Sequence, residues 1–471
     1  MIAVRSIFIA QHPDRSVFRK YFQKGSEGMK QRIERFIDRL SRERVNIHGF
    51  LLNVNGREIA KAYYAPFREG APHRLYSVSK TMTGLAVGML ADAGKLRLDQ
   101  PVCDFFRDWL PGNPDGRLTR LTLRDMLRMS TCFAHTAYRE GVDENWARAF
   151  FTVPPTHEPG TVFCYDTGAS QVLSALVRRV SGQEVIDFLE ERLFTPLGLK
   201  DNRYWLRDPS GCCQGGTGLC MSLRDMHKIA QCLLDGGNHL VPAWFVEQMQ
   251  QKHIETPMQP NEEERYGYGW QCWRTRAGWT MYGMGGQLAV LCPQKRALLS
   301  TVADTRLDPF GVQRIYNAFF EELYPFLDGA ACEPMTFSLQ IPALENKPAF
   351  AVPESGRYVF GERNGLGLKW LQLSEHALTY ENSRGVILLP LVPETSMEIA
   401  YPGWPGVPAL LSTGWADQGL LRVRCDAIGD APCGFDMLLQ FRDQCVTVQC
   451  RRSNDPLTDG YEGVASGYPI K

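Results

Sequence analysis

The sequence predicts an α+β fold: helices flank an antiparallel sheet, an all-helical insertion interrupts that sheet, and a separate all-β domain follows. Two observations lead to this prediction. Residues 28–330 run through a helix, two strands, a helical block, three or four strands and a final helix, an order typical of a sheet covered by helices. From 335 to 471, short strand-like runs alternate with turns, as in small sandwiches and barrels. Residues 1–27 form an N-terminal extension.

The first elements are defined by local patterns. Apolar residues recur at helical spacing over 28–43 among Lys and Arg side chains. Two strand-like runs, 49–54 and 58–64, flank Asn55-Gly56, a dipeptide that favours a tight hairpin turn. A helix then runs from Ser77 to Ala93, where Gly94 stops it.

The later elements follow in the same way. Residues from about 105 to 262 are predicted to be mostly helical, and Ser222 with Asp225 resembles a capping box that opens one of these helices. Strand character returns over 266–305, and an amphipathic helix over 310–324 completes the unit. In the C-terminal domain the strand-like runs are 356–361, 367–373, 377–381, 420–425 and 445–450.

Composition limits the function classes. Lys plus Arg and Asp plus Glu both number 52, so no overall positive field favours a nucleic-acid partner. No stretch approaches the ~18 uninterrupted apolar residues of a membrane span, and the mildly apolar N-terminus lacks the pattern of a signal peptide. We therefore expect a cytoplasmic protein with no membrane span. The oligomeric state stays open.

The fourteen cysteines do not indicate a metal site. They are scattered along the chain, without a Cys-x-x-Cys pair, and no His-Glu-x-x-His occurs. We expect reduced, mostly buried thiols, and neither a metal nor an organic cofactor.

One motif carries nucleophilic chemistry. Ser77 and Lys80 form the only Ser-x-x-Lys of the chain and lie at the start of a predicted helix. Side chains at i and i+3 share one helix face, so the amine can contact the hydroxyl. Ser79 points to a different face. Two further segments, 159–169 and 282–287, place glycines and a tyrosine beside helix and strand ends, where a substrate can approach the backbone.

Together with their order along the chain, these motifs resemble the serine β-lactamase-like superfamily, in its branch of class C β-lactamases, esterases and penicillin-binding-protein-like hydrolases. The resemblance covers about residues 28–325. Its motifs are 77–81, 93–102, 159–168, 196–199, 215–219 and 266–270. No Gly-x-Ser-x-Gly elbow occurs, which counts against an α/β-hydrolase.

The resemblance implies roles for individual residues. Ser77 matches the nucleophile, Lys80 its activating partner and Tyr165 the second general acid/base. The backbone N–H groups of Ser77 and Gln287 would form the oxyanion hole. The implied substrate-binding residues are Thr167, Met284, Gly285 and Gly286. Either Trp270 or Trp273 could line the acyl pocket, and Trp270 is the one we include among the candidate site residues.

Two departures from the family pattern guide the choice of activity. Thr167 stands where the family usually has a carboxamide, and Met284 stands where it has Lys or His. Because Met284 cannot bind a carboxylate, a small ester or amide is preferred as substrate over a β-lactam or a D-amino-acid peptide. A catalytically inert scaffold used for binding or regulation is the alternative from another class.

The proposed mechanism makes a prediction about proton affinities. Burial at a helix N-terminus should lower the pKa of Lys80 from the ~10.4 of free lysine. A phenolate at Tyr165, next to that cation, should have a pKa below the ~10 of free tyrosine.

Overall fold

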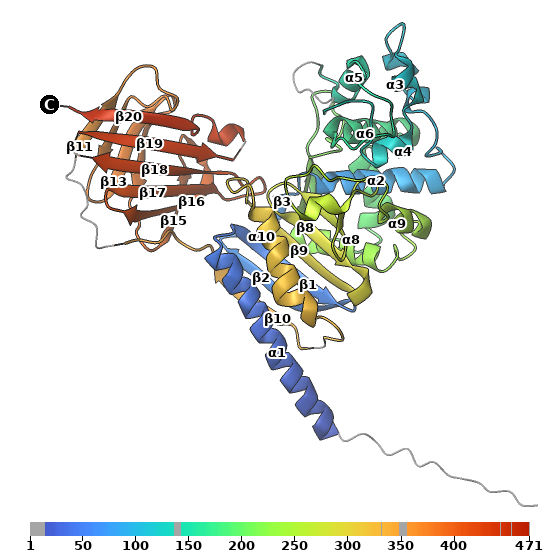
Figure 1. Ribbon diagram of the computed structural model, residues 1–471, viewed down its shortest axis with the longest axis horizontal. Coiled ribbons are helices and arrows are strands. Elements are labelled where there is room, and N and C mark those ends of the chain that lie inside the picture. The colour runs from blue at the N-terminus through green and yellow to red at the C-terminus, as the bar shows by residue number, and fades with distance from the viewer. Residues whose placement is uncertain are drawn as a thin grey trace, which may run out of the picture.

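The computed structural model describes residues 15–135, 143–330, 332–347, 356–442, 444–453 and 455–470, with side chains from residue 28 onward. A mixed helix-and-sheet domain and an all-β domain lie side by side (Figure 1), so the predicted fold class is confirmed. Of the expected N-terminal extension, residues 1–14 lie outside the described residues. Residues 15–27 belong to helix α1 (Arg15–Arg42), which begins earlier than the amphipathic pattern suggested.

A seven-stranded sheet forms the centre of the first domain. Its order is β10-β2-β1-β9-β8-β7-β6, and every neighbouring pair is antiparallel except β10 with β2. The strands are β1 (Ile47–Val54), β2 (Arg57–Ala65), β6 (Trp273–Thr275), β7 (Gly278–Gly283), β8 (Gln287–Cys292), β9 (Ala297–Ala303) and β10 (Met335–Gln340).

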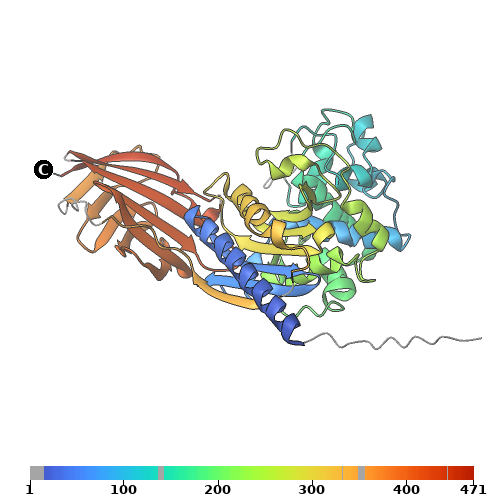
Figure 2. The same ribbon diagram turned by 60° about the horizontal axis from the view of Figure 1, so that its bottom comes forward.

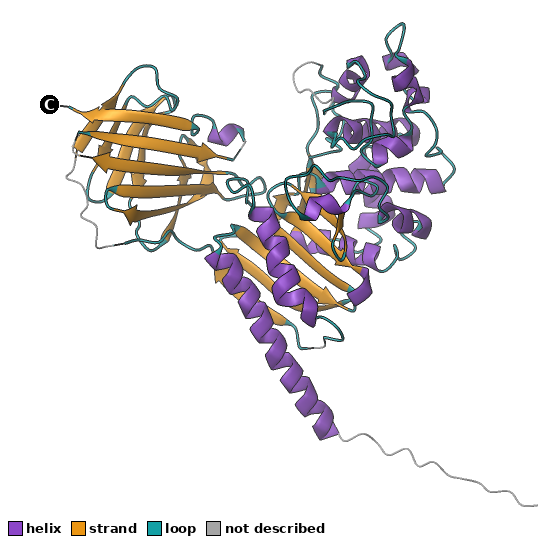
Figure 3. Ribbon diagram, in the orientation of Figure 1, coloured by secondary structure: helices purple, strands orange, loops and turns teal. Residues whose placement is uncertain are grey.

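The strand patterns are explained by what covers the sheet. Every residue of β1, β8 and β9 is buried, since both faces are covered. Helices α1 and α10 (Gly311–Ala318) cover one face and share a core with Phe50 and Leu299. Helices α2 (Val78–Asp92) and α8 (Leu223–Leu234) contact the other face. Figures 2 and 3 show α1 lying across the sheet, with most other helices gathered on the opposite side.

Several boundaries differ from the expected ones. The hairpin turn at Asn55 and Gly56 is present, with φ of 51° and 73°. Strand character is expected from residue 266 onward, but before β6 the structure has only isolated bridges at Tyr268. The helix expected over 310–324 ends as α10 at Ala318 and continues as a π-turn over Phe319–Leu323.

Along the chain, the helical insertion lies between β2 and β6, which are consecutive strands of the main sheet in the sequence. Its larger helices are α6 (Thr167–Ser181), α8 and α9 (Ala243–Met249), with shorter ones at α3 (Gly116–Arg120), α4 (Leu123–Leu127), α5 (Trp146–Ala149) and α7 (Val185–Leu189). It also holds strands β4 (Tyr204–Trp205) and β5 (Leu219–Ser222), and β5 pairs with both β4 and β3 (Pro72–Arg74) in a small sheet. Because β3 precedes Ser77 by a few residues, this sheet joins the insertion to the start of α2.

The C-terminal domain is a ten-stranded antiparallel sheet, in the order β14-β13-β12-β11-β20-β19-β18-β17-β16-β15, that curls around one core (Figure 1). Its strands are β11 (Gly356–Phe360), β12 (Trp370–Leu373), β13 (Ala377–Asn382), β14 (Gly385–Pro390), β15 (Ser396–Tyr401), β16 (Trp404–Asp417), β17 (Leu420–Ala427), β18 (Gly434–Arg442), β19 (Cys445–Arg452) and β20 (Gly463–Pro469). Strand β10, just past the proposed boundary at residue 335, instead forms the edge of the first sheet, because Met335, Phe337 and Leu339 pack onto its core.

The loop between β17 and β18 makes hydrogen bonds to the first domain. The Asp430 carbonyl accepts the backbone N–H of Arg74, and its carboxylate accepts the Tyr204 hydroxyl. The Arg306 guanidinium donates to the Pro432 carbonyl and is paired with Asp304. No helix among the described residues is long and apolar enough to cross a membrane.

Candidate active site

Ser77 is the last residue before α2, at a turn held by its neighbours. Tyr76 has a φ of 47°, in the left-handed region that non-glycine residues rarely adopt. The Ser79 hydroxyl donates to the Tyr76 carbonyl at 2.6 Å and accepts the Leu219 N–H at 2.9 Å. Ser79 is thus an anchor of the turn, while Ser77 itself is half-buried.

Lys80 lies one helical turn after Ser77 and is almost completely buried, at 1% exposure. Its Nζ is 2.9 Å from Ser77 Oγ and donates to the Gly216 carbonyl at 2.8 Å. Burial lowers the pKa of Lys80 to about 7, against the opposing effect of the Asp166 carboxylate. The expectation of a lowered lysine pKa is confirmed in direction, and its physical cause is desolvation of the ammonium.

Tyr165 approaches Lys80 from a different element. It lies two residues before α6, and its ring centroid is 4.8 Å from Lys80 Nζ. Burial raises the pKa of Tyr165 above that of free tyrosine, and its interaction with Ser77 offsets this only in part. The expected lowering is therefore wrong: desolvation of a phenolate outweighs the nearby cation, and Tyr165 is a neutral phenol at neutral pH.

The carboxylate that acts on the pKa of Lys80 is that of Asp166. It caps α6: its side chain accepts the Gly168 N–H at 2.8 Å and the Thr131 hydroxyl at 3.2 Å. Sequence reasoning missed its influence on Lys80, because the two residues are 86 positions apart in the chain. The only available signal was its place between Tyr165 and Thr167.

An aromatic cluster surrounds Tyr165. The Trp273 and Phe163 ring centroids lie 5.4 and 6.4 Å from that of Tyr165. Trp270 is instead buried in the main core, stacked on His253 with centroids 4.9 Å apart. The tryptophan beside the reactive groups is therefore Trp273, because the chain turns between the two residues at Gln271, which has a φ of 56°.

The turn between β7 and β8 forms another side of the site. Gly285 and Gly286 have φ of 86° and 98°, which glycine adopts without strain. A side chain at Gly283 would collide with the Leu75 carbonyl, so this turn lies close to the residues preceding Ser77. Met284 is 43% exposed.

Gln287 supports this turn through its side chain. Its amide nitrogen donates to the Met284 carbonyl at 3.0 Å and the Ala303 carbonyl at 2.7 Å, and its amide oxygen accepts the Ala303 N–H at 3.2 Å. The side chain thus ties β8 to β9 and holds the backbone of the turn in place.

Gly216 brings Lys80 and Thr167 together. A Cβ at this position would lie 2.7 Å from Thr167 Cγ2 and 3.3 Å from Lys80 Nζ. Only glycine lets the carbonyl of residue 216 approach the ammonium so closely. The sequence marks 215–219 as a family motif, but it assigns Gly216 no role.

We expect Gly216→Ala to lower kcat/KM for a p-nitrophenyl ester by about 10²-fold, because a displacement of Lys80 by a few tenths of an ångström misaligns it with Ser77. The measurement is steady-state hydrolysis at a fixed pH. Gly112→Ala is the matched control, since a Cβ there meets no atom within 4 Å. Equal losses in both variants would contradict this role for Gly216.

The structure thus brings Ser77, Lys80, Tyr165 and Thr167 into one cluster, with the 284–287 turn beside the segment that precedes Ser77. Trp270 lies outside it. Among the described residues, no group of three or more His, Cys, Asp and Glu side chains is placed to hold a metal ion.

Comparisons with known proteins indicate the family of the chain. A family model described as Beta-lactamase matches residues 34–319. Esterase EstB of Burkholderia gladioli is 26% identical over 216 residues, covering 40% of this chain and 55% of the esterase. The 6-aminohexanoate-dimer hydrolase of Paenarthrobacter ureafaciens is 27% identical over 203 residues, covering 40% of this chain and 52% of the hydrolase. The chain therefore spans about half the length of each relative.

A solved structure extends the likeness to both domains. The crystal structure of SurE with D-Leu has a TM-score of 0.51 at 16% identity and covers 94% of this chain and 100% of that one. At this identity the likeness shows the fold alone.

Proposed function

The chain belongs to the beta-lactamase family, and from that premise we propose that it is a serine hydrolase that forms an acyl-enzyme on Ser77 and cleaves a small ester or amide. The observation that carries the proposal is the pairing of a buried lysine, of pKa about 7, with a serine hydroxyl 2.9 Å away. At neutral pH a large fraction of Lys80 is neutral and can accept a proton.

Acylation follows from this pairing. Neutral Lys80 accepts the Ser77 proton while Oγ attacks the substrate carbonyl carbon, giving a tetrahedral oxyanion and an ammonium. As the C–O or C–N bond breaks, the leaving group takes a proton from the Tyr165 hydroxyl. Lys80 returns its proton to Tyr165 through the shared hydrogen-bonded cluster, leaving an acyl-serine and a neutral lysine.

In deacylation, water is the nucleophile and Ser77 Oγ is the leaving group. A water molecule attacks the acyl carbon, and its proton passes to Lys80, with the neutral Tyr165 hydroxyl as relay. Ser77 Oγ then leaves and recovers a proton from Lys80. The backbone N–H groups of Ser77 and Gln287 stabilise the oxyanion in both steps, a role supported by the proximity of the 283–287 turn to Leu75.

Labelling of the intact protein with a fluorophosphonate tests the nucleophile directly. We expect a single covalent adduct on Ser77, located by mass spectrometry after digestion, because fluorophosphonates react with activated serine hydroxyls. No adduct would favour the inert scaffold, and an adduct on another serine would move the active site.

Met284 supports an ester or amide in preference to a β-lactam. We expect Met284→Lys to raise the ratio of cephalosporin to p-nitrophenyl ester turnover by about tenfold, because the new ammonium can pair with the cephalosporin carboxylate. Met258→Lys is the control, since Met258 is 90% exposed and lies outside the site. Wild-type turnover of cephalosporin faster than of esters would contradict the ranking.

A further inference from the structure

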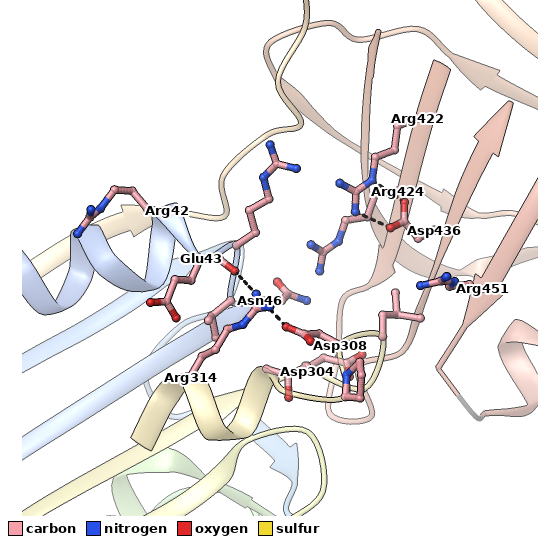
Figure 4. A pocket seen from close by; sticks show the side chains of 15 residues that line it. Arg42, Glu43, Asn46, Asp304, Asp308, Arg314, Arg422, Arg424, Asp436 and Arg451 are labelled. Carbon is pink, nitrogen blue, oxygen red and sulfur yellow. Dashed lines mark hydrogen bonds and ion pairs between the residues drawn. The ribbon is translucent and has the colours of Figure 1, made fainter. Parts of the chain in front are cut away.

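A cleft of about 410 Å³ separates the two domains, and none of the proposed catalytic residues lines it. Its walls come from the end of α1 and the turn after it, from the segment joining β9 to α10, and from strands β17, β18 and β19 (Figure 4). Guanidinium groups dominate its lining: Arg42, Arg44, Arg314, Arg422, Arg424 and Arg451.

The β-domain side of the cleft is a row of charged side chains across three strands. Arg422 and Arg424 alternate along β17 with the buried Val423, so both lie on the outer face of the sheet. Register places Asp436 of β18 opposite Arg424, and Arg451 of β19 opposite Asp436. In Figure 4 this row faces Asn46, Asp304 and Asp308 of the first domain.

The acidic residues of the lining neutralise only part of this row, because each of them is already engaged in an ion pair. Glu43 pairs with Arg39, and Asp304 with Arg306, neither of which lines the cleft. Within the lining, the pairs are Asp308 with Arg314 and Asp436 with Arg422. Arg424 is paired with Asp426 behind it.

What remains is a surplus of positive charge. Within the part of the chain that the structure describes, Arg451 makes no ion pair. Arg44 pairs only with Glu345, and the two side chains are 59% and 72% exposed, so solvent screens the pair. Arg42 also has no ion-pair partner among the described residues, but its side chain is directed away from the β-domain in Figure 4.

We propose that this cleft binds a small polyanion with at least two oxyanion groups, either phosphates or carboxylates. Guanidinium groups bind both by paired N–H···O contacts. A volume of 410 Å³ suits a small-molecule ligand. Arg451 on β19 and Arg44 after α1 come from opposite walls, so a ligand with two anionic groups can bridge them, whereas a single anion contacts only one wall.

Calorimetric titration of the full chain tests the proposal, with pyrophosphate and citrate as polyanions and orthophosphate as the single anion. We expect one saturable site for pyrophosphate or citrate, and at least about tenfold weaker binding of orthophosphate. The tighter of the two polyanions identifies the phosphate or the carboxylate class. Affinity should fall as salt is raised.

Matched variants locate the site. We expect the double variant Arg44→Gln/Arg451→Gln to bind the polyanion about tenfold or more weakly than the wild type. The fold should stay intact because both side chains are exposed. Arg442→Gln, an exposed arginine at the end of β18 outside the cleft, should bind as wild type does. Ser77→Ala should also bind normally, which separates this test from the proposed hydrolase activity.

Two outcomes would overturn the proposal. One is the absence of saturable binding of both pyrophosphate and citrate at low salt. The other is binding that the Arg44 and Arg451 double variant retains in full.

Discussion

Ser77→Ala is expected to lower kcat/KM for a p-nitrophenyl ester by about 10⁴-fold or more, because the proposed mechanism has no nucleophile other than the Ser77 hydroxyl. Without the Ser77 Oγ no acyl-enzyme can form. Burst-phase kinetics and steady-state rates measure the loss, and fluorophosphonate labelling should disappear with it.

Ser79→Ala is the matched control for this variant. The Ser79 hydroxyl holds the turn through hydrogen bonds with Tyr76 and Leu219, and neither bond involves Lys80. Its loss should reduce activity by only about tenfold, through a looser turn, and labelling of Ser77 should persist. A Ser77→Ala variant as active as Ser79→Ala would rule out Ser77 as the nucleophile.

The second large effect concerns pH. If neutral Lys80 is the base, kcat/KM should rise about tenfold per pH unit below its pKa of about 7 and level off above it. The neutral Tyr165 phenol should remain protonated across this range, because burial raises its pKa. Because Lys80 and Tyr165 share one cluster, the observed midpoint belongs to that cluster.

Lys80→Arg should lose at least about 10³-fold at every pH from about 6 to about 9, because a guanidinium does not deprotonate in this range. A variant that kept most of its activity with the same pH profile would contradict a lysine base. Tyr165 would then be the remaining candidate.

Stability provides an independent readout of the same pKa. The pKa of Lys80 is about 7 in the folded protein, compared with 10.5 for the unperturbed side chain. Between pH 7 and pH 10.5 the unfolded chain therefore binds more protons at this lysine than the folded chain does, and the stability of the wild type rises with pH in this range. Below about 7 both states carry the ammonium, and its burial is fully unfavourable. Lys80→Met should therefore raise Tm over wild type more at pH 6 than at pH 9. An equal difference at both pH values would mean that the lysine pKa is not lowered.

The sequence by itself determined the features that depend on short-range geometry. Asn55-Gly56 sets the hairpin between β1 and β2 because both residues accept positive φ. Ser77 and Lys80 meet because residues i and i+3 share one helix face. The order of elements was enough to predict the α+β class, since helices and strands with one apolar side must cover one another.

Other features depended on tertiary packing. Lys80 and Asp166 interact through the contact between α2 and the start of α6, and the Gly216 carbonyl reaches Lys80 from 136 residues away. The direction of the Tyr165 pKa shift follows from how thoroughly its hydroxyl is desolvated, which no spacing along the chain encodes.

The same holds for residues whose patterns were ambiguous. Trp270 and Trp273 are both aromatic and buried, and only the turn at Gln271 decides which of them lies beside Tyr165. Strand β10 has an ordinary alternating pattern, yet its pairing with β2 places it in the first domain. Local sequence determines the secondary-structure propensity of a segment and the face that it buries. Packing of the whole chain determines which element covers this face, and therefore how strongly the ionisable groups of the site are desolvated and in which direction their pKa values shift.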